Sequence, residues 1–188
     1  MKNLIDPKWS GKISMADPRA GSPLTGSAVL LRRYGEKFIR TLVLQQKPVI
    51  VKNPHQQMDW LLGGRYPVTI GVPSSIFVEY GRRGVDLKPI KTIRGPMSWT
   101  QGVGGIQVLA NAPHPNATKV YINWLLTRDV QKRLMAAVRL NSRRKDVPVM
   151  DPDAAVDYKH IDEYIGGQTE AMQPYQKKTS AIYRELIH

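Results

Sequence analysis

The chain has 188 residues, and its 28 Lys+Arg against 15 Asp+Glu give a formal net charge of +13. A hydrophobic content of 41% excludes a disordered, collagen-like or low-complexity chain, and the length fits one domain or one and part of another. Because cysteine is absent, the chain has no disulfide, no thiolate metal site and no cysteine nucleophile. No apolar run reaches the roughly 18 residues that a membrane-spanning helix needs.

In the first half of the chain, short β-branched runs bounded by glycine and proline predict buried strands. They lie at residues 11–16, 48–51 and 67–72. Residues 87–90 are expected to form an edge strand, since Pro89 lacks a backbone N–H.

Helices are expected to follow each of these three strands. Two helices follow the first strand and are separated at Tyr34-Gly35, and another begins at Asn53-Pro54 with a cap residue and a proline. The helix after the third strand follows Pro73-Ser74-Ser75. Strands that alternate with helices predict an α/β fold with a mainly parallel sheet.

The second half carries one more predicted strand, at residues 103–110, and then helices. The helix at residues 116–127 has Ala117, Val120, Tyr121 and Trp124 on one apolar stripe, and another spans residues 130–138. After a loop that contains Arg143-Arg144 and Pro148, a helical tail covers about residues 158–187, broken at Gly166-Gly167.

The positive charge is scattered in short pairs, and aromatic residues do not alternate with these pairs as in a base-stacking surface. We therefore interpret most of it as solvated helix faces, and a nucleic-acid groove is the weaker interpretation. The four histidines lack ligand spacing, and no nucleophile-elbow, phosphate-loop or dinucleotide motif is present. The sequence thus indicates no catalytic residue, no metal site and no cofactor, which argues against an enzyme.

Two junctions between a strand and the following helix are the candidate binding sites. After the first strand, Arg19, Ser22 and Thr25 accompany a helix N-terminus, and Ser74 and Ser75 do so after the third. Free N–H groups, hydroxyls and a guanidinium at a helix N-terminus are typical of an anion site. Each hydroxyl could equally serve only as a helix cap. Ligands of open α/β sheets bind beyond the carboxyl ends of the strands, where both junctions lie.

Several segments resemble the bacterial extracellular solute-binding proteins of the iron(III)-type ABC transporter subgroup. These segments are 6–18 (DPKWSGKISMADP), 46–51 (QKPVIV), 64–72 (GRYPVTIGV), 112–126 (APHPNATKVYINWLL) and 142–148 (SRRKDVP). The segment 112–126 is the most specific of these, and the resemblance extends over about residues 3–148.

The resemblance implies the α/β fold of one lobe of a type II periplasmic binding protein, with a C-terminal helical tail. Residues 8–95 would form the second lobe, 96–138 a crossover toward a missing first lobe, and 139–188 a loop and the C-terminal helices. It further implies a periplasmic or extracellular parent, a small-molecule solute and an ABC permease in the membrane as partners. Residues 1–6 show no signal peptide, and an isolated lobe with an uncovered apolar face is expected to self-associate.

One departure from the family bears on the ligand. Ferric-ion binders of this superfamily carry adjacent tyrosines just after the third strand, whereas this chain reads Val72-Pro73-Ser74-Ser75 and has no tyrosine before Tyr80. Serine hydroxyls do not replace phenolate ligands, so we expect a small anionic organic solute. Its ligands would be the five junction residues, with Gln56 and Gln57 as weaker candidates. Ferric-ion binding, a basic nucleic-acid-associated protein and an anion-processing enzyme remain the alternatives.

Overall fold

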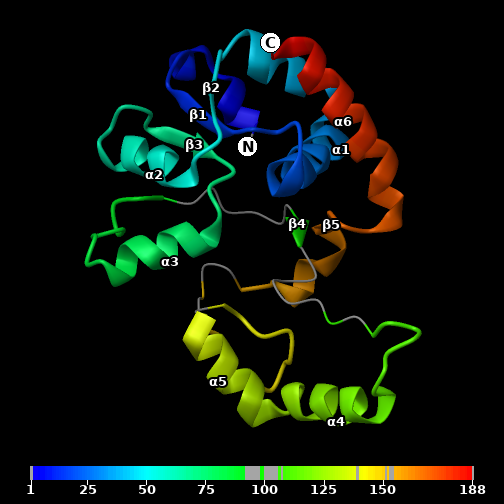
Figure 1. Cartoon of the computed structure of the whole chain (residues 1–188). Helices are drawn as coiled ribbons and strands as arrows, with labels where there is room; N and C mark the ends of the chain where they lie inside the picture. The colour runs from blue at the N-terminus through cyan, green and yellow to red at the C-terminus, as the bar shows by residue number, and fades with distance from the viewer. Residues whose placement is uncertain are drawn as a thin grey trace. The chain divides into compact units, whose positions relative to one another are not determined.

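The computed structural model describes residues 2–91, 98–99, 106, 108–138, 140–150, 152 and 155–187. The chain divides into two compact units (Figure 1). The first unit comprises Met1–Thr100 together with Asp162–His188, and the second comprises Gln101–Ile161. The division into 8–95, 96–138 and 139–188 stays a prediction.

A three-stranded parallel sheet forms the centre of the first unit. It consists of β1 (Ile13–Ala16), β2 (Val49–Val51) and β3 (Val68–Ile70), in the order β2-β1-β3. In the middle strand, Ile13, Ser14 and Met15 are buried. The three strands predicted from β-branched runs are thereby confirmed, and with them the α/β class with a parallel sheet.

The first helix is long and kinked. α1 (Gly21–Leu44) is interrupted at Gly35, whose φ of 79° and ψ of 172° belong to a region that only glycine adopts readily. The prediction of two helices separated at Tyr34-Gly35 is therefore confirmed. Both halves bury an apolar stripe, with Leu30 and Leu31 before the kink and Ile39 after it.

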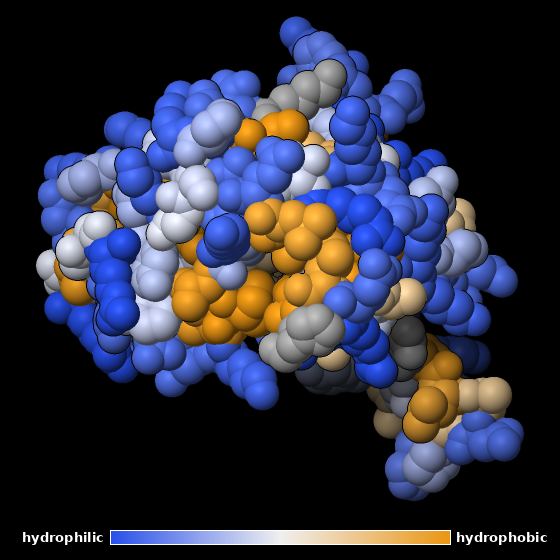
Figure 2. Space-filling model, turned by 90° about the horizontal axis from the view of Figure 1, so that it is seen from above, coloured by the Kyte–Doolittle hydropathy of each residue, from blue (hydrophilic) through white to orange (hydrophobic). Residues whose placement is uncertain are grey.

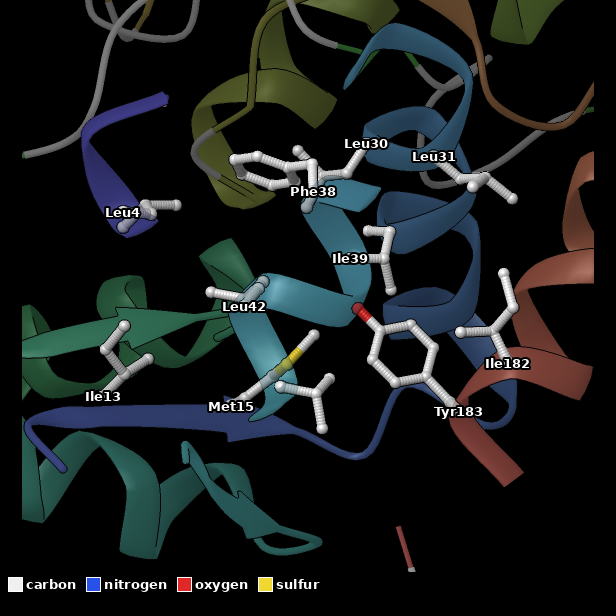
Figure 3. Close-up of a cluster of buried hydrophobic side chains, with 11 residues drawn as sticks. Leu4, Ile13, Met15, Leu30, Leu31, Phe38, Ile39, Leu42, Ile182 and Tyr183 are labelled. Atoms are coloured by element: carbon white, nitrogen blue, oxygen red, sulfur yellow. The ribbon is translucent and has the colours of Figure 1, made fainter. Parts of the chain in front are cut away.

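The last helix of the chain packs along the first. α6 (Gln173–Leu186) lies beside α1, although some 130 residues separate them along the chain (Figure 1). Tyr183 is completely buried and points from α6 toward Ile39 and Leu42, above Met15 of the sheet (Figure 3). The main core is therefore closed by residues from both ends of the unit.

Two shorter helices follow β2 and β3. α2 (Pro54–Leu62) and α3 (Ser74–Arg82) share a small cluster of buried side chains, namely Met58, Ile76 and Tyr80. The remaining elements of this unit are two 3-10 turns before β1 (Lys2–Ile5 and Pro7–Trp9), β4 (Ser98–Trp99) paired in parallel with β5 (Ile165–Gly166), and the 3-10 turn Glu170–Met172.

In the described part of the second unit, α4 (Pro115–Leu125) and α5 (Arg128–Val138) contact each other. The 3-10 segment Tyr158–Glu163 leads out of this unit. Over the span of the predicted helical tail, it is followed by β5, the 3-10 turn Glu170–Met172 and α6. The break at Gly166-Gly167 is confirmed, since β5 ends at Gly166.

The structure does not confirm two of the predicted strands. Residues 87–90 form a turn and no strand, because the Ile90 N–H bonds to the Leu87 carbonyl at 3.0 Å instead of pairing with a neighbouring strand. The expected strand at 103–110 falls largely outside the described residues, and Val108 and Leu109 are not in a strand.

No described helix is both long enough and apolar enough to cross a membrane. Seen from above, the surface is mostly hydrophilic, and apolar side chains gather in a few patches near the centre of that face (Figure 2). This surface agrees with the 23% of charged residues in the sequence, a fraction usual for globular domains.

Candidate ligand-binding site

A pocket of about 400 Å³ lies at the carboxyl ends of all three strands of the first unit. Its wall includes Ala16 at the end of β1, Val51 at the end of β2 and Gly71 just after β3. This is the edge at which ligands bind in open α/β sheets. The other lining residues come from the three loops that follow the strands: Asp17, Ala20, Gly21, Ser22, Pro23, Lys52, Pro54, Gln57 and Pro73.

Three helices begin at this pocket. The first turn of α1 lines it from Ala20 to Pro23, while α2 and α3 contribute Pro54 and Pro73 at their N-termini. Asn53 caps α2, because its Oδ1 accepts hydrogen bonds from the N–H groups of His55 and Gln56.

No side chain caps α1 or α3. The amides in the first turn of a helix have no partner inside that helix, and the N-terminal end carries a partial positive charge. Uncapped helix N-termini at one pocket therefore favour an anion there.

Gly71 keeps the pocket open. Its φ is +88°, and a Cβ at this position would lie 3.0 Å from the Cβ of Ala16 and 3.9 Å from the Cβ of Pro23. Both neighbours line the pocket, so any larger side chain at position 71 would occupy space between the ends of β1 and β3.

Asp17 and Arg19 form an ion pair beside the pocket. The Arg19 Nε and Nη2 atoms each donate to the Asp17 carboxylate at 2.8 Å, and the Arg19 N–H donates to Oδ1 at 3.1 Å. Hydrogen bonds from the Arg19 side chain are the main cause that lowers the pKa of Asp17. The Asp17 carboxylate therefore stays ionised, and the positive charge of Arg19 balances its negative charge.

Lys52 adds a second positive charge. It lines the pocket directly after β2, and its field also contributes to the lowered pKa of Asp17. One carboxylate thus stands beside two cations, so the net local charge is positive. This charge and the helix N-termini both favour an anionic ligand.

Gln57 is a buried polar side chain in the wall of the pocket. It is 0% exposed, and its Nε2 donates to Thr69 Oγ1 at 2.7 Å and to the Ile70 carbonyl at 3.0 Å. Because a carbonyl oxygen only accepts, this contact fixes which end of the amide faces Ile70. The other end, Oε1, has no hydrogen-bond partner within the described part of the chain.

The structure brings some of the sequence-predicted residues together and leaves others apart. Ser22 and Gln57 line the pocket, and Arg19 reaches it through Asp17. Besides Arg19, four of the predicted residues do not line it: Thr25, Ser74, Ser75 and Gln56.

The latter three are exposed, and Thr25 packs its methyl group near Gly167. Neither Thr25 nor Ser74 caps its helix. A direct role of the seven predicted residues in ligand binding stays a prediction.

Sequence reasoning missed Lys52 and the pocket-lining role of Asp17. The same strand-end rule that selected the first and third junctions applies to the second strand, where Lys52 is the first residue after β2. The capping signal of Asn53-Pro54 indicates a helix start, and the sequence prediction at this junction names Gln56 and Gln57 but not Lys52.

The described residues contain no group of three or more His, Asp or Glu that could hold a metal ion. Tyr80, the first tyrosine after β3, is buried and does not line the pocket. Its hydroxyl donates to Asp59, and this bond is the main cause that raises its pKa. The uncapped helix N-termini and Lys52 at the pocket are suited to binding an anion.

One solved structure has a fold similar to that of this chain. The whole chain is similar to iron-bound HitA from Pseudomonas aeruginosa, with a TM-score of 0.65 and 19% sequence identity, and it covers 60% of that chain. The likeness shows that the two chains share a fold. No family model matches the chain.

A protein of Haemophilus influenzae, described only as uncharacterized, is 23% identical over 133 residues. The match covers 70% of this chain and 38% of that protein. The chain thus spans only part of the length of both proteins that it matches.

Proposed function

We propose that this chain is a ligand-binding lobe of a solute-capture protein that serves an ABC-type importer, and that it binds a small anionic organic solute. One observation carries the proposal, namely the uncapped N-termini of α1 and α3 at a pocket that Lys52 makes positive. The ordinary mode of such proteins is closure of two lobes on the solute, followed by presentation to a membrane permease. On this proposal the chain is a binding module rather than an enzyme, and its parent acts in the periplasm or outside the cell.

The experiment is isothermal titration of the protein with a panel of small organic anions, such as hydroxycarboxylates and sugar phosphates, at low and raised salt. We expect binding of at least one anion and weaker binding of the same anion by a Lys52→Met variant. Lys91→Met, at an exposed lysine outside the pocket, is the matched control and should bind like the wild type. Failure of every anion to bind would contradict the proposal.

A ferric ion is the second candidate, because the similar structure, HitA, is iron-bound. The described residues of this chain offer no cluster of carboxylates and imidazoles for such an ion, and Tyr80 is hydrogen-bonded in the interior. The same titration with a soluble ferric chelate separates the candidates. Ferric binding without any anion binding would favour the metal, and the reverse result would favour the anion.

A further inference from the structure

The wall of the pocket is mostly apolar. Eight of its twelve lining residues have no polar side-chain atom, namely three prolines, two alanines, two glycines and one valine. The alanines and prolines are all exposed or half-buried: Ala16, Ala20, Pro23, Pro54 and Pro73. A molecule in the pocket can therefore reach them.

A proline stands at or near the start of each of the three helices that begin at the pocket. Pro23 is the third residue of α1, Pro54 is the first residue of α2, and Pro73 directly precedes α3. Proline has no backbone N–H, and its ring presents methylene groups instead. These helix starts therefore offer carbon surface to a ligand beside the N–H groups of the other residues.

Carbon atoms also bound the space beside Gly71. The side-chain atoms nearest to a Cβ added there are the Cβ of Ala16 at 3.0 Å and the Cβ of Pro23 at 3.9 Å. The methyl group of Ala16 and the ring of Pro23 thus both border the place that the absent side chain leaves open between the strand ends.

Of the four polar side chains in the wall, two are held by the protein itself. Arg19 donates hydrogen bonds to both oxygens of Asp17, and Gln57 is 0% exposed. Ser22 and Lys52 are exposed. A ligand with many hydroxyl groups would lose hydrogen bonds to water at such a wall, whereas an apolar carbon skeleton is stabilised by leaving water.

We infer that the pocket selects an anion with an apolar carbon skeleton, such as an aliphatic carboxylate, over a polyhydroxylated anion of the same size. The charge of this ligand lies toward Lys52 and the uncapped helix N-termini, and its skeleton lies against the alanine and proline side chains. This inference rests on the proposed anion site and narrows its substrate class.

The test is a titration of the ¹⁵N-labelled protein with acetate, butanoate, hexanoate and gluconate at neutral pH and equal ionic strength. Amide NMR shifts measure each affinity and locate the site. We expect affinity to rise by about two- to fourfold for each added methylene. Hexanoate should bind at least about tenfold more tightly than gluconate, which has the same number of carbon atoms and the same charge.

The shifts must also lie at the pocket. The amides of Gly71 and Lys52, which line it, should respond to hexanoate. Shifts confined to α4, whose apolar side chains are exposed, would overturn the inference, because the chain-length effect would then belong to another surface.

Two proline variants assign the effect to the wall. Pro54→Ser replaces ring carbons at the first residue of α2 and should lower the ratio of hexanoate to acetate affinity by at least about twofold. Pro115→Ser makes the same change at the first residue of α4, outside the pocket, and should keep the ratio. A folded Pro54→Ser protein that keeps the ratio contradicts the inference, and if it does not fold, the wild-type series decides.

The outcomes separate the inference from the function on which it rests. Equal affinity for acetate, hexanoate and gluconate overturns the inference and leaves the anion site intact. Hexan-1-ol has the same carbon skeleton as hexanoate without its charge, so equal binding of the two would overturn the anion site and the inference with it. Binding of no anion also overturns both.

Discussion

Arg19 neutralises a carboxylate of the pocket rather than lining the pocket itself. In Arg19→Ala, Asp17 would present an uncompensated negative charge to the ligand, so we expect anion affinity to fall by about three- to tenfold. Asp17→Asn in the same background should restore affinity close to that of the wild type. Titration of the single and double variants measures this coupling.

The double variant also tests the direct role that the sequence predicts for Arg19. If the guanidinium binds the solute itself, removal of Asp17 will not rescue the loss. Restored affinity would instead assign Arg19 to the electrostatic balance of the pocket.

Tyr183 makes the stability of the first unit sensitive to alkaline pH. Burial raises the pKa of its phenol from 10.0 to about 12, so the neutral form is favoured in the folded state. The stabilisation is complete below the unfolded pKa and is lost as pH rises from 10.0 toward about 12. Between about pH 9 and about pH 11 we expect a loss of about 1 kcal/mol from this group, measured by urea unfolding.

Substitution identifies the contribution of this tyrosine. Tyr183→Phe should unfold with a smaller difference between the two pH values than the wild type shows. Tyr175→Phe changes a more exposed tyrosine of the same helix and should keep the wild-type difference. An unchanged difference in Tyr183→Phe would contradict the assignment.

At the scale of elements, two glycines near the start of α1 have opposite roles. A Cβ on Gly167 would lie 2.8 Å from the Thr25 methyl carbon, so β5 and its turn approach α1 closely. Gly26 is inside α1, and a Cβ there meets nothing within 4 Å. We expect Gly167→Ala to destabilise the protein by about 1–3 kcal/mol and Gly26→Ala to stabilise it by about 0.5–1 kcal/mol.

Chemical denaturation of both variants checks this pair of expectations. Gly26→Ala serves as the control for the general effect of replacing glycine by alanine. Equal stability of Gly167→Ala and the wild type would mean that β5 does not pack against α1 as described.

The features that follow from local pattern were predictable from the sequence. β1, β2 and β3 follow from β-branched runs, and the kink of α1 follows from Gly35. The position of the pocket was also predictable, because the carboxyl ends of parallel strands share one edge.

Features that depend on contacts in space were not predictable in this way. The orientation of the Gln57 amide depends on Thr69 and Ile70, which only the fold brings to its nitrogen. The sequence likewise favours a strand at residues 87–90, but the chain turns there and offers no neighbouring strand among the described residues. Local pattern thus located the pocket but not the contacts that orient the side chains in its wall.

At the scale of the whole molecule, α4 presents an uncovered apolar stripe. All residues of α4 are described and none is buried, and Val120, Tyr121 and Trp124 are exposed by 70%, 57% and 54%. We expect a second copy of the chain to cover this stripe, as the sequence predicts for an isolated lobe. Sedimentation velocity over a range of concentrations should show association of the wild-type protein.

Trp124→Lys should shift the protein toward monomer by placing a charge in the stripe. Lys119→Ser changes an exposed polar position of the same helix and should associate like the wild type. A wild-type protein that sediments as a single monomeric species at every concentration would contradict the expectation.

Because α6 packs against α1, the first unit can complete its fold only after its last helix has been synthesised. α1 ends at Leu44 and α6 at Leu186, so synthesis of the intervening chain takes on the order of ten seconds. During that time the apolar face of α1 that Ile182 and Tyr183 later cover has no such partner. The helix that lines the pocket with its N-terminal residues therefore reaches its final packing only at the end of translation, which makes this interval the period of greatest exposure to chaperones and proteases.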